Sequence, residues 1–198
     1  HCKEDGGITN FNISVAVTDK FMEALEKNEE YELVSPHDGE VVRKLSAGMV
    51  WDEIAKGTWK TGDPGLIFID RINKSPANPI RNDGWIIEST NPCGEQPLYP
   101  FDACNLGSIF LGYFVKETND GVKTIDWEGL RETTKTAVRF LDDVIERNPL
   151  PLPQIKEVVS RIRRIGLGVG GWADMLIELG ISYDSEEALQ LAGKVMKF

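Results

Sequence analysis

A short segment without polar side chains limits the fold of this chain more than any other feature. Residues 66–69 are Leu, Ile, Phe and Ile, and they follow a turn signal, Thr-Gly-Asp-Pro-Gly, at residues 61–65. A continuous apolar run of this length predicts a strand buried on both faces, which is typical of parallel sheets covered by helices. The sequence therefore favours an α/β fold.

The flanking segments alternate between strand and helix patterns. Residues 11–17 alternate large apolar with small or polar side chains, which predicts a strand whose apolar face packs inward, and Thr18 can cap the helix that follows. Ser46 and Asp126 stand at N-cap positions before two more helices with apolar stripes. We expect the second of these helices to end before Pro149, because proline cannot continue a helix.

A glycine-rich segment at residues 166–171 superficially resembles a dinucleotide-binding loop. That loop requires a strand immediately before it, whereas residues 155–164 predict a helix. We therefore expect a close-packed glycine turn that leads into a helix at residues 172–179.

Charge and cysteine content exclude several classes of protein. The formal net charge of −10 argues against a nucleic-acid-binding surface, which needs clustered Lys and Arg. The chain has no run of about 18 apolar residues and no signal-peptide pattern, so we expect a cytoplasmic protein without a membrane partner. Three cysteines without metal-site spacing predict neither a disulfide framework nor a metal site. Two of them, Cys93 and Cys104, lie near each other in sequence and suggest redox chemistry.

A thiol, an amide and a carboxylate occur at even spacing in the segment from Ser89 to Glu95. If this backbone is extended, Asn91, Cys93 and Glu95 face the same side, because side chains two residues apart on a strand point the same way. Residues 85–88 predict a short strand immediately before them. A turn with a buried structural cysteine is the alternative that the residues alone leave open.

Several motifs in this chain closely resemble ribonucleotide reductases, specifically the adenosylcobalamin-dependent class II enzymes. The active-site loop of that family is matched by residues 91–98 (NPCGEQPL) and 104–109 (CNLGSI), and supporting blocks occur in the family's order at residues 8–15 (ITNFNISV), 61–68 (TGDPGLIF) and 164–169 (RIGLGV). The resemblance covers almost the whole chain. It implies that residues 1–198 are part of the catalytic domain, truncated at both ends, and contribute to a ten-stranded α/β barrel with the active-site loop at its centre.

The resemblance assigns roles to three residues of the loop. It implies that Cys93 becomes a thiyl radical and abstracts the 3′-hydrogen of the substrate ribose. Glu95 corresponds to the general base that takes the 3′-hydroxyl proton, and Asn91 to the residue that hydrogen-bonds the substrate.

The resemblance also assigns a second cysteine. Cys104 corresponds to a redox-active thiol that forms a disulfide with a cysteine upstream of the first residue of this chain, and no role is carried over to Cys2. Ser89 and Thr90 are candidate substrate-binding hydroxyls, although hydroxyls at a strand end are as often structural.

The implied function is the reduction of ribonucleotides to 2′-deoxyribonucleotides for DNA precursor synthesis. Adenosylcobalamin is the implied cofactor, a ribonucleotide the substrate, and thioredoxin or glutaredoxin the reductant. The 198 residues alone are expected to be inactive, because parts of the catalytic cycle lie outside them. The sequence leaves open the phosphorylation state of the substrate and the oligomeric state, a homodimer included.

Three other interpretations compete with this one. A class I reductase large subunit, whose radical comes from a diiron subunit, shares the Asn-x-Cys-x-Glu pattern, but Pro92, Gly94 and the eleven-residue step from Cys93 to Cys104 favour class II. A cytosolic thiol–disulfide protein would use Cys93 and Cys104 as its redox couple. In a non-enzymatic interaction module, Cys93 would serve packing alone.

Overall fold

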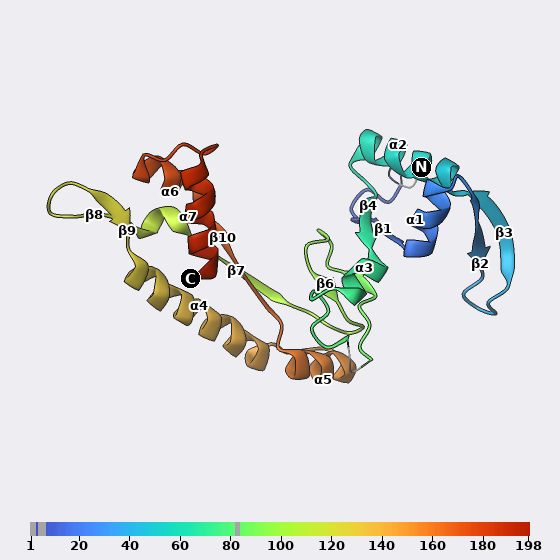
Figure 1. The fold of residues 1–198 in the computed structure, drawn as a ribbon. Coiled ribbons are helices and arrows are strands. Elements are labelled where there is room, and N and C mark those ends of the chain that lie inside the picture. The colour runs from blue at the N-terminus through green and yellow to red at the C-terminus, as the bar shows by residue number, and fades with distance from the viewer. Residues whose placement is uncertain (1–2, 4–6, 82–83) are drawn as a thin grey trace. The chain divides into compact units, whose positions relative to one another are not determined.

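The computed structural model describes residue 3 and residues 7–81 and 84–198. Its elements, labelled in Figure 1, form two compact units, His1–Pro100 and Phe101–Phe198, and each is described by itself. No helix among the described residues is long and apolar enough to cross a membrane.

The first unit contains one parallel strand pair. Strand β1 (Ser14–Val17) pairs with β4 (Gly65–Phe68), which places Ser14 opposite Gly65. The predicted strand at residues 66–69 is therefore present, but the prediction that it is buried on both faces is wrong for this structure. Leu66 and Phe68 are 36% and 38% exposed. They are exposed because β4 has a single partner strand among the described residues, so no full sheet surrounds it.

Two capped helices connect these strands. Helix α1 (Asp19–Glu26) begins after Thr18, whose hydroxyl accepts a hydrogen bond from the Phe21 amide, and α2 (Ala47–Thr61) begins after Ser46 in the same way. Both caps confirm the sequence predictions. An antiparallel hairpin of β2 (Glu30–Val34) and β3 (Val41–Ser46) lies between the helices in sequence. The core of this part consists of Val17, Phe21, Ala24 and Ala47.

The segment before the predicted active-site loop does not form the expected strand. After helix α3 (Ile69–Lys74), the short strand is β5 (Ser89–Thr90), which pairs antiparallel with β6 (Pro97–Leu98). Residues 85–87 lie outside any strand because side chains supply their hydrogen-bond partners. The Asn73 side chain bonds the backbone of Ile87, and the Asn78 side chain donates to the carbonyl of Trp85.

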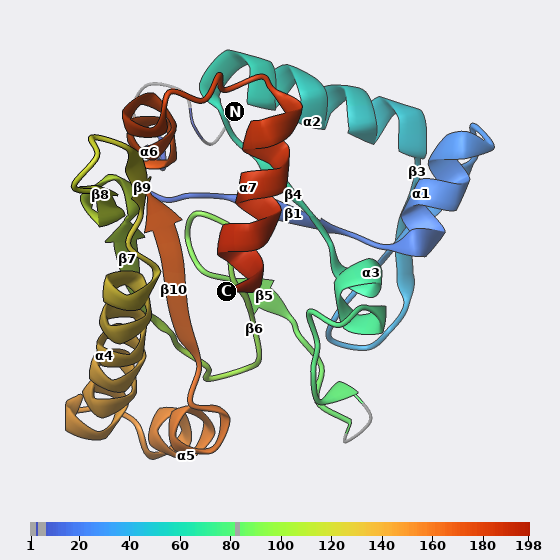
Figure 2. The same ribbon diagram turned by 60° about the vertical axis from the view of Figure 1, so that its left-hand side comes forward.

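The second unit is built on another parallel pair. Strand β7 (Asn105–Phe110) pairs with β10 (Ile165–Gly170), and the long helix α4 (Trp127–Arg147) packs against both, as Figure 2 shows for β10. Helix α4 begins after Asp126 and ends before Pro149, as predicted, but the Asp126 side chain makes no capping hydrogen bond. The Asp126 carboxylate is held by Lys116 at 2.9 Å. Helix α5 (Pro153–Ile162) follows.

Residues 166–170 of the glycine-rich segment belong to strand β10, so the predicted glycine turn is limited to Gly171, whose φ is 64°. The predicted helix follows directly as α6 (Trp172–Leu179). Gly166 lies opposite Leu106 and Gly170 opposite Phe110 in the neighbouring strand. A Cβ atom on Gly166 would lie 2.5 Å from Leu106 Cδ2, and one on Gly170 would lie 3.1 Å from the Phe110 ring. The glycines thus make room for large side chains on β7. Three of the four glycines at residues 166–171 lie in the strand itself, which is not the arrangement of a dinucleotide-binding loop.

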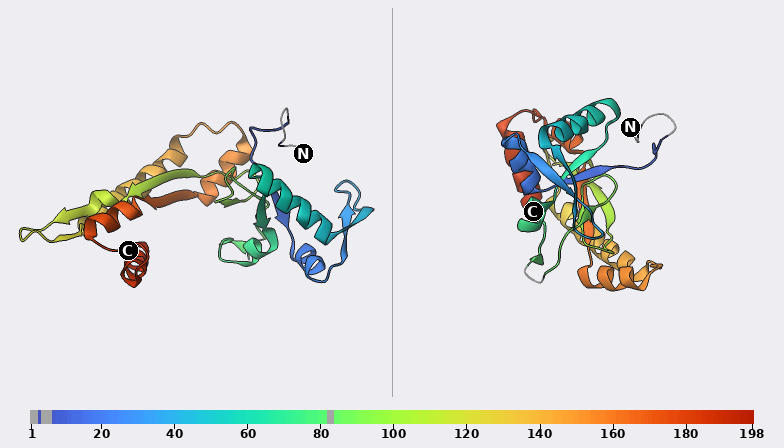
Figure 3. Two further views of the ribbon diagram at one scale, coloured as in Figure 1. Left: turned by 90° about the horizontal axis from the view of Figure 1, so that it is seen from above. Right: turned by 90° about the vertical axis from the view of Figure 1, so that its right-hand side faces the viewer.

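The remaining elements complete the core of the second unit. A 3-10 helix, η2 (Leu111–Phe114), leads into the hairpin of β8 (Val115–Glu117) and β9 (Lys123–Ile125), which extends beyond the helices of its unit in Figure 3. Helices α6 (Trp172–Leu179) and α7 (Glu186–Lys197) close the unit. Its core consists of Ile109, Leu111, Ile125, Leu130, Met175 and Val195. Every sheet among the described residues has two strands, so this part of the chain contains parallel α/β pairs but no closed barrel.

Candidate active site

The predicted active-site loop is the turn of the β5–β6 hairpin. The Asn91 amide donates to the Gln96 carbonyl at 3.1 Å, and the Gly94 amide donates to the Asn91 carbonyl at 3.0 Å. Gly94 has a φ of 81°, in the left-handed region that glycine adopts without strain. The backbone is not extended here, because these bonds fold residues 91–96 back on themselves, so the condition under which Asn91, Cys93 and Glu95 would all face one side is not met.

The turn nevertheless brings two of the three predicted catalytic residues together. The Asn91 side-chain amide donates to Glu95 Oε1, while Asn91 Oδ1 accepts a bond from the Gln96 amide at 3.0 Å. Asn91 and Glu95 thus face each other across the base of the turn. Cys93 lies at its tip as an exposed free thiol, and a Cβ placed on the adjacent Gly94 would meet no atom within 4 Å. The thiol is therefore open to approach by a large group.

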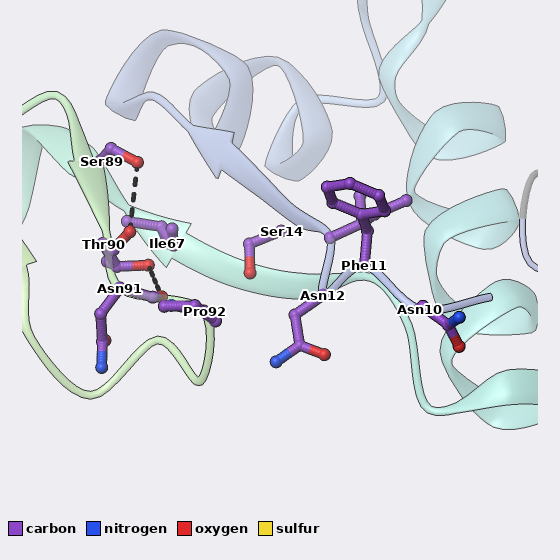
Figure 4. Close-up of a pocket in the computed structure, with 10 residues that line it drawn as sticks. Asn10, Phe11, Asn12, Ser14, Ile67, Ser89, Thr90, Asn91 and Pro92 are labelled. Carbon is purple, nitrogen blue, oxygen red and sulfur yellow. Dashed lines mark hydrogen bonds between the residues drawn. The ribbon is translucent and has the colours of Figure 1, made fainter. Parts of the chain in front are cut away.

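A cavity of about 540 Å³ borders the hairpin (Figure 4). Ser89, Thr90 and Asn91 line it, whereas Cys93 and Glu95 are not part of its lining. The full lining comprises residues 10–14, Ile67 and residues 89–92. None of these side chains is charged, so the cavity suits a neutral group that makes hydrogen bonds.

Sequence reasoning missed one wall of this cavity, which is formed by residues 10–14 and whose polar side chains are Asn10, Asn12 and Ser14. Figure 4 shows the amide of Asn12 and the hydroxyl of Ser14 on the same side of the chain, with Phe11 on the other. Their spacing of two residues was a usable signal, because polar side chains at this spacing line one face of an extended segment. Gly65 keeps space beside this wall, since a Cβ there would lie 3.1 Å from Ser14 Oγ.

Neighbouring groups fix both walls of the cavity. The Ser89 and Thr90 hydroxyls donate to the carbonyls of Thr90 and Asn91, at 3.3 and 3.0 Å, so their oxygen lone pairs are left to accept bonds. On the opposite wall, the Ile13 amide donates to Asp63 at 3.4 Å. The Lys3 ammonium, 3.0 Å from the same carboxylate, holds the pKa of Asp63 below its ordinary value.

Cys104 belongs to the second unit and lies directly before β7, where it is half-buried. Near it in sequence, the Asp102 carboxylate is fully buried and accepts a bond from Arg164 Nε at 2.8 Å. This ion pair joins the segment before β7 to the start of β10. Cys2 lies outside the described residues. In the part of the chain that the structure describes, no group of three or more His, Cys, Asp or Glu side chains could hold a metal ion.

Comparisons with known proteins agree with the motifs in these two units. The model of the ribonucleotide reductase barrel domain matches residues 1–198. A vitamin B12-dependent ribonucleoside-diphosphate reductase from Thermoplasma acidophilum is 53% identical over 195 residues, which are 98% of this chain and 24% of that protein. A protein of the same name from Mycobacterium tuberculosis is 46% identical over 190 residues, 96% of this chain and 26% of that protein.

A more distant relative has a similar name. The vitamin B12-dependent ribonucleotide reductase of Streptomyces avermitilis is 30% identical over 186 residues, 94% of this chain and 19% of that protein. The chain thus spans about a quarter or less of the length of these curated relatives. Because the family model covers every residue, the chain belongs to the ribonucleotide reductase barrel-domain family.

Proposed function

We propose that this chain is a central part of an enzyme that reduces ribonucleotides to 2′-deoxyribonucleotides through a thiyl radical on Cys93. The observation that carries the proposal is the hairpin turn, which pairs Asn91 with Glu95 and leaves the Cys93 thiol exposed at its tip, beside a cavity. Thiol, carboxylate and amide are the three groups that this chemistry needs at the sugar. The vitamin B12-dependent relatives favour class II chemistry over a diiron large subunit.

The hairpin would sit at the centre of a ten-stranded α/β barrel, and residues 1–198 would form part of that single catalytic domain. Two features support this. The chain has two parallel strand pairs, β1–β4 and β7–β10, and apolar side chains on β4 and β7 are exposed. Strands with exposed apolar faces are expected where further strands and helices complete a closed sheet.

The reaction at the hairpin can be written so that atoms and electrons balance. The Cys93 thiyl radical takes the hydrogen atom from C3′, which breaks a C–H bond and forms an S–H bond. Glu95 accepts the 3′-hydroxyl proton, and the 2′-hydroxyl leaves as water after one thiol of a pair that includes Cys104 gives it a proton, which leaves a 3′-ketone and a radical at C2′. The second thiol gives a hydrogen atom to C2′. The two sulfurs then join in a disulfide, and the electron left over passes to the 3′-ketone, which takes back the proton from Glu95. Cys93 finally returns a hydrogen atom to C3′ and is again a thiyl radical.

Adenosylcobalamin, when bound, would supply the organic radical that converts the Cys93 thiol to a thiyl. The geometry around Cys93 fits such a group, because the thiol is exposed and the space beside Gly94 is open. Pro92, Cys93 and Gly94 are the residues that would face it. The role of this chain is to present the thiol on a turn whose base is fixed by hydrogen bonds.

The cavity beside the hairpin would hold the uncharged part of the nucleotide, its ribose and base. Asn91, Ser89 and Thr90 would bind it from the hairpin, and Asn12 and Ser14 from the opposite wall. Phosphates are normally bound by cationic side chains or helix N-termini, and the lining contains no charged residue. We therefore place the phosphate-binding residues elsewhere in the full-length protein.

The proposed assembly follows from the redox chemistry. A dithiol protein such as thioredoxin or glutaredoxin would reduce the disulfide formed by Cys104 after each turnover. A reducing compartment is needed for this step, which favours the cytoplasm. A homodimer is the oligomeric state that we propose to test first.

The deciding experiment uses the full-length protein that contains this chain. Deoxynucleotide formation from ribonucleotides is measured under reducing conditions, with and without adenosylcobalamin, for the unmodified protein and for Cys93→Ala and Cys104→Ser. We expect product only with the cofactor and none from Cys93→Ala, even with an external dithiol present.

Other results have defined meanings. Activity without adenosylcobalamin would identify a metal-subunit reductase. If no deoxynucleotide forms but Cys93 and Cys104 exchange disulfides with a dithiol, the chain is a thiol–disulfide protein and the proposal fails.

A further inference from the structure

A cluster of buried and half-buried side chains next to the hairpin is used neither by the proposed chemistry nor by the cavity. It is centred on Asn73, the fifth residue of α3. The Asn73 amide group donates to the carbonyls of Ile69 at 3.1 Å and Ile87 at 2.8 Å. Its Oδ1 atom accepts bonds from the Ile87 amide at 2.8 Å and from Asn78 at 3.1 Å. One side chain thus bonds both backbone groups of Ile87, as a neighbouring strand would.

Asn78 extends this cluster to the other side of the hairpin. Its side chain is 1% exposed and donates to the carbonyl of Trp85 at 2.8 Å. The Tyr99 hydroxyl donates to Asn78 Oδ1 at 2.6 Å, and the Tyr99 ring packs edge-on against Trp85 with centroids 5.2 Å apart. Ile87 and Tyr99, at 0% and 3% exposed, are buried with it. We call Asn73, Asn78 and Tyr99 the amide cluster.

The amide cluster holds the hairpin at both of its ends. A single residue, Glu88, separates Ile87 from the start of β5, and Tyr99 is the first residue after β6. The intervening Glu88 amide donates to the Leu98 carbonyl at 3.3 Å. Strands β5 and β6 contain only two residues each, and an isolated hairpin is marginally stable even when its strands are longer. The position of the turn therefore depends on groups outside the hairpin.

We propose that Asn73 and Asn78 are positioning residues that fix the hairpin and so hold Cys93 at the distance from the ribose that hydrogen abstraction requires. Leaving a buried polar group without its hydrogen-bond partners costs free energy. A shift of the backbone at Trp85 or Ile87 would break the bonds to the side-chain amides of the cluster, so the present arrangement of the backbone is favoured over others. These hydrogen bonds therefore fix the positions of Ile87 and Tyr99, which flank the two ends of the hairpin. The kinetic part of the inference rests on the proposed function, whereas the structural part does not.

The test compares Asn73→Ala and Tyr99→Phe in the full-length protein with matched controls. Asn119→Ala removes an exposed asparagine from the β8–β9 turn, and Tyr113→Phe removes the hydroxyl of a tyrosine that is 88% exposed. Two readouts are taken for each variant. The first is kcat and KM for ribonucleotide reduction with adenosylcobalamin and a dithiol. The second is hydrogen exchange of the backbone amides at residues 87–98 and, for comparison, in α2.

We expect Asn73→Ala to lower kcat by about 10- to 100-fold with a much smaller change in KM, the scale of loss that follows a displacement of about 1 Å at a reacting centre. The amides of residues 87–98 should exchange faster, while those of α2 keep their protection. Tyr99→Phe should change the same quantities in the same direction by less. Both controls should leave kcat and exchange unchanged.

Each remaining outcome decides the inference. If the amides of α2 lose as much protection from hydrogen exchange as residues 87–98, the unit as a whole is destabilised and the inference is overturned. Unchanged hydrogen exchange at residues 87–98 would overturn it as well. If Asn73→Ala does not fold, the comparison of Tyr99→Phe with Tyr113→Phe decides, because a single hydroxyl is lost in each. If the unmodified protein makes no deoxynucleotide, the proposed function fails, and hydrogen exchange still tests the role of the cluster.

Discussion

At the scale of single residues, the hairpin turn pairs a carboxylate with an amide and leaves the thiol apart. Asn91 donates to Glu95 in this structure, so the two side chains satisfy each other. In the proposed reaction, a substrate hydroxyl that enters between them would have to replace this bond, which would make both groups available at the same moment. The side chain of Cys93, in contrast, is a free thiol exposed at the tip.

The far wall of the cavity leads to a prediction for Asn12. Replacing Asn12 by alanine in the full-length protein should raise KM about 2- to 12-fold and leave kcat nearly unchanged, since one hydrogen bond contributes about 0.5–1.5 kcal/mol. Steady-state kinetics with a ribonucleotide would measure both constants, and Asn119→Ala is the matched control. An unchanged KM in a folded Asn12→Ala protein would remove Asn12 from the substrate site.

At the scale of elements, ion pairs join consecutive helices of the second unit. Arg163, the residue after α5, contacts Asp142 on α4 at 2.9 Å and also pairs with Glu146 one turn further along. Hydrogen bonding from Arg163 lowers the pKa of the Asp142 carboxyl below its ordinary value of 3.8. Both side chains are partly exposed, so the pair orients the start of β10 more than it stabilises the fold.

This pair leads to a prediction about pH. A carboxyl whose pKa is lower in the folded state stabilises the fold above its unfolded pKa and loses that effect as the pH falls through the folded pKa. Asp142→Asn should therefore lower the thermal unfolding temperature of the full-length protein at pH 7, and the difference should shrink below pH 3.8. Asp143→Asn, an exposed neighbour on α4, is the control. A difference that persists at low pH would rule out the charge as its cause.

Elements with local signals could be predicted from the sequence, and elements that depend on distant partners could not. Thr18 and Ser46 cap their helices with bonds to amides three residues away, so their role is visible in the sequence. Strand β10 was missed because its glycines are explained only by Leu106 and Phe110 on β7. Residues 85–87 resembled a strand, but amides from another segment take the place of the partner strand.

In the candidate site, too, residues with a local sequence signal could be predicted and residues brought in from a distant segment could not. Asn91, Cys93 and Glu95 could be chosen from one contiguous motif, although their geometry depends on a turn at Gly94 that the expected extended backbone did not include. Asn12 and Ser14 lie more than seventy residues before that motif. Only the pairing of β1 with β4 and the position of the hairpin bring them to the same cavity.

At the scale of the whole molecule, this chain has two cores and many exposed apolar side chains on its parallel strands. Leu106, Phe110 and Val169 are 59%, 57% and 45% exposed on β7 and β10. Leu106 and Phe110 lie four residues apart and therefore on the same face of β7, and we expect other parts of the full-length protein to cover them. Hydroxyl-radical footprinting would test this: the Phe110 side chain should be oxidised more slowly in the full-length protein than in the 198-residue chain.

The 198-residue chain alone should not reduce ribonucleotides, even with adenosylcobalamin and a dithiol. The cavity contains no charged residue for a phosphate, and the resemblance places the partner of Cys104 outside the chain. Deoxynucleotide formation by the purified chain is the measurement, with the full-length protein as a positive control. Turnover by the chain alone would mean that all required groups lie within it.

The amide cluster also has a consequence for the order in which this protein assembles during synthesis. The hydrogen bonds described above for the cluster join residues between Ile69 and Tyr99, so its three members leave the ribosome in one short interval. Strand β7, in contrast, cannot pair with β10 until α4 and α5 have been made. Contacts between residues close in sequence form faster than distant ones, because less chain has to be ordered to close the loop. The support beneath Cys93 can therefore be complete before the strand that follows Cys104 has found its partner.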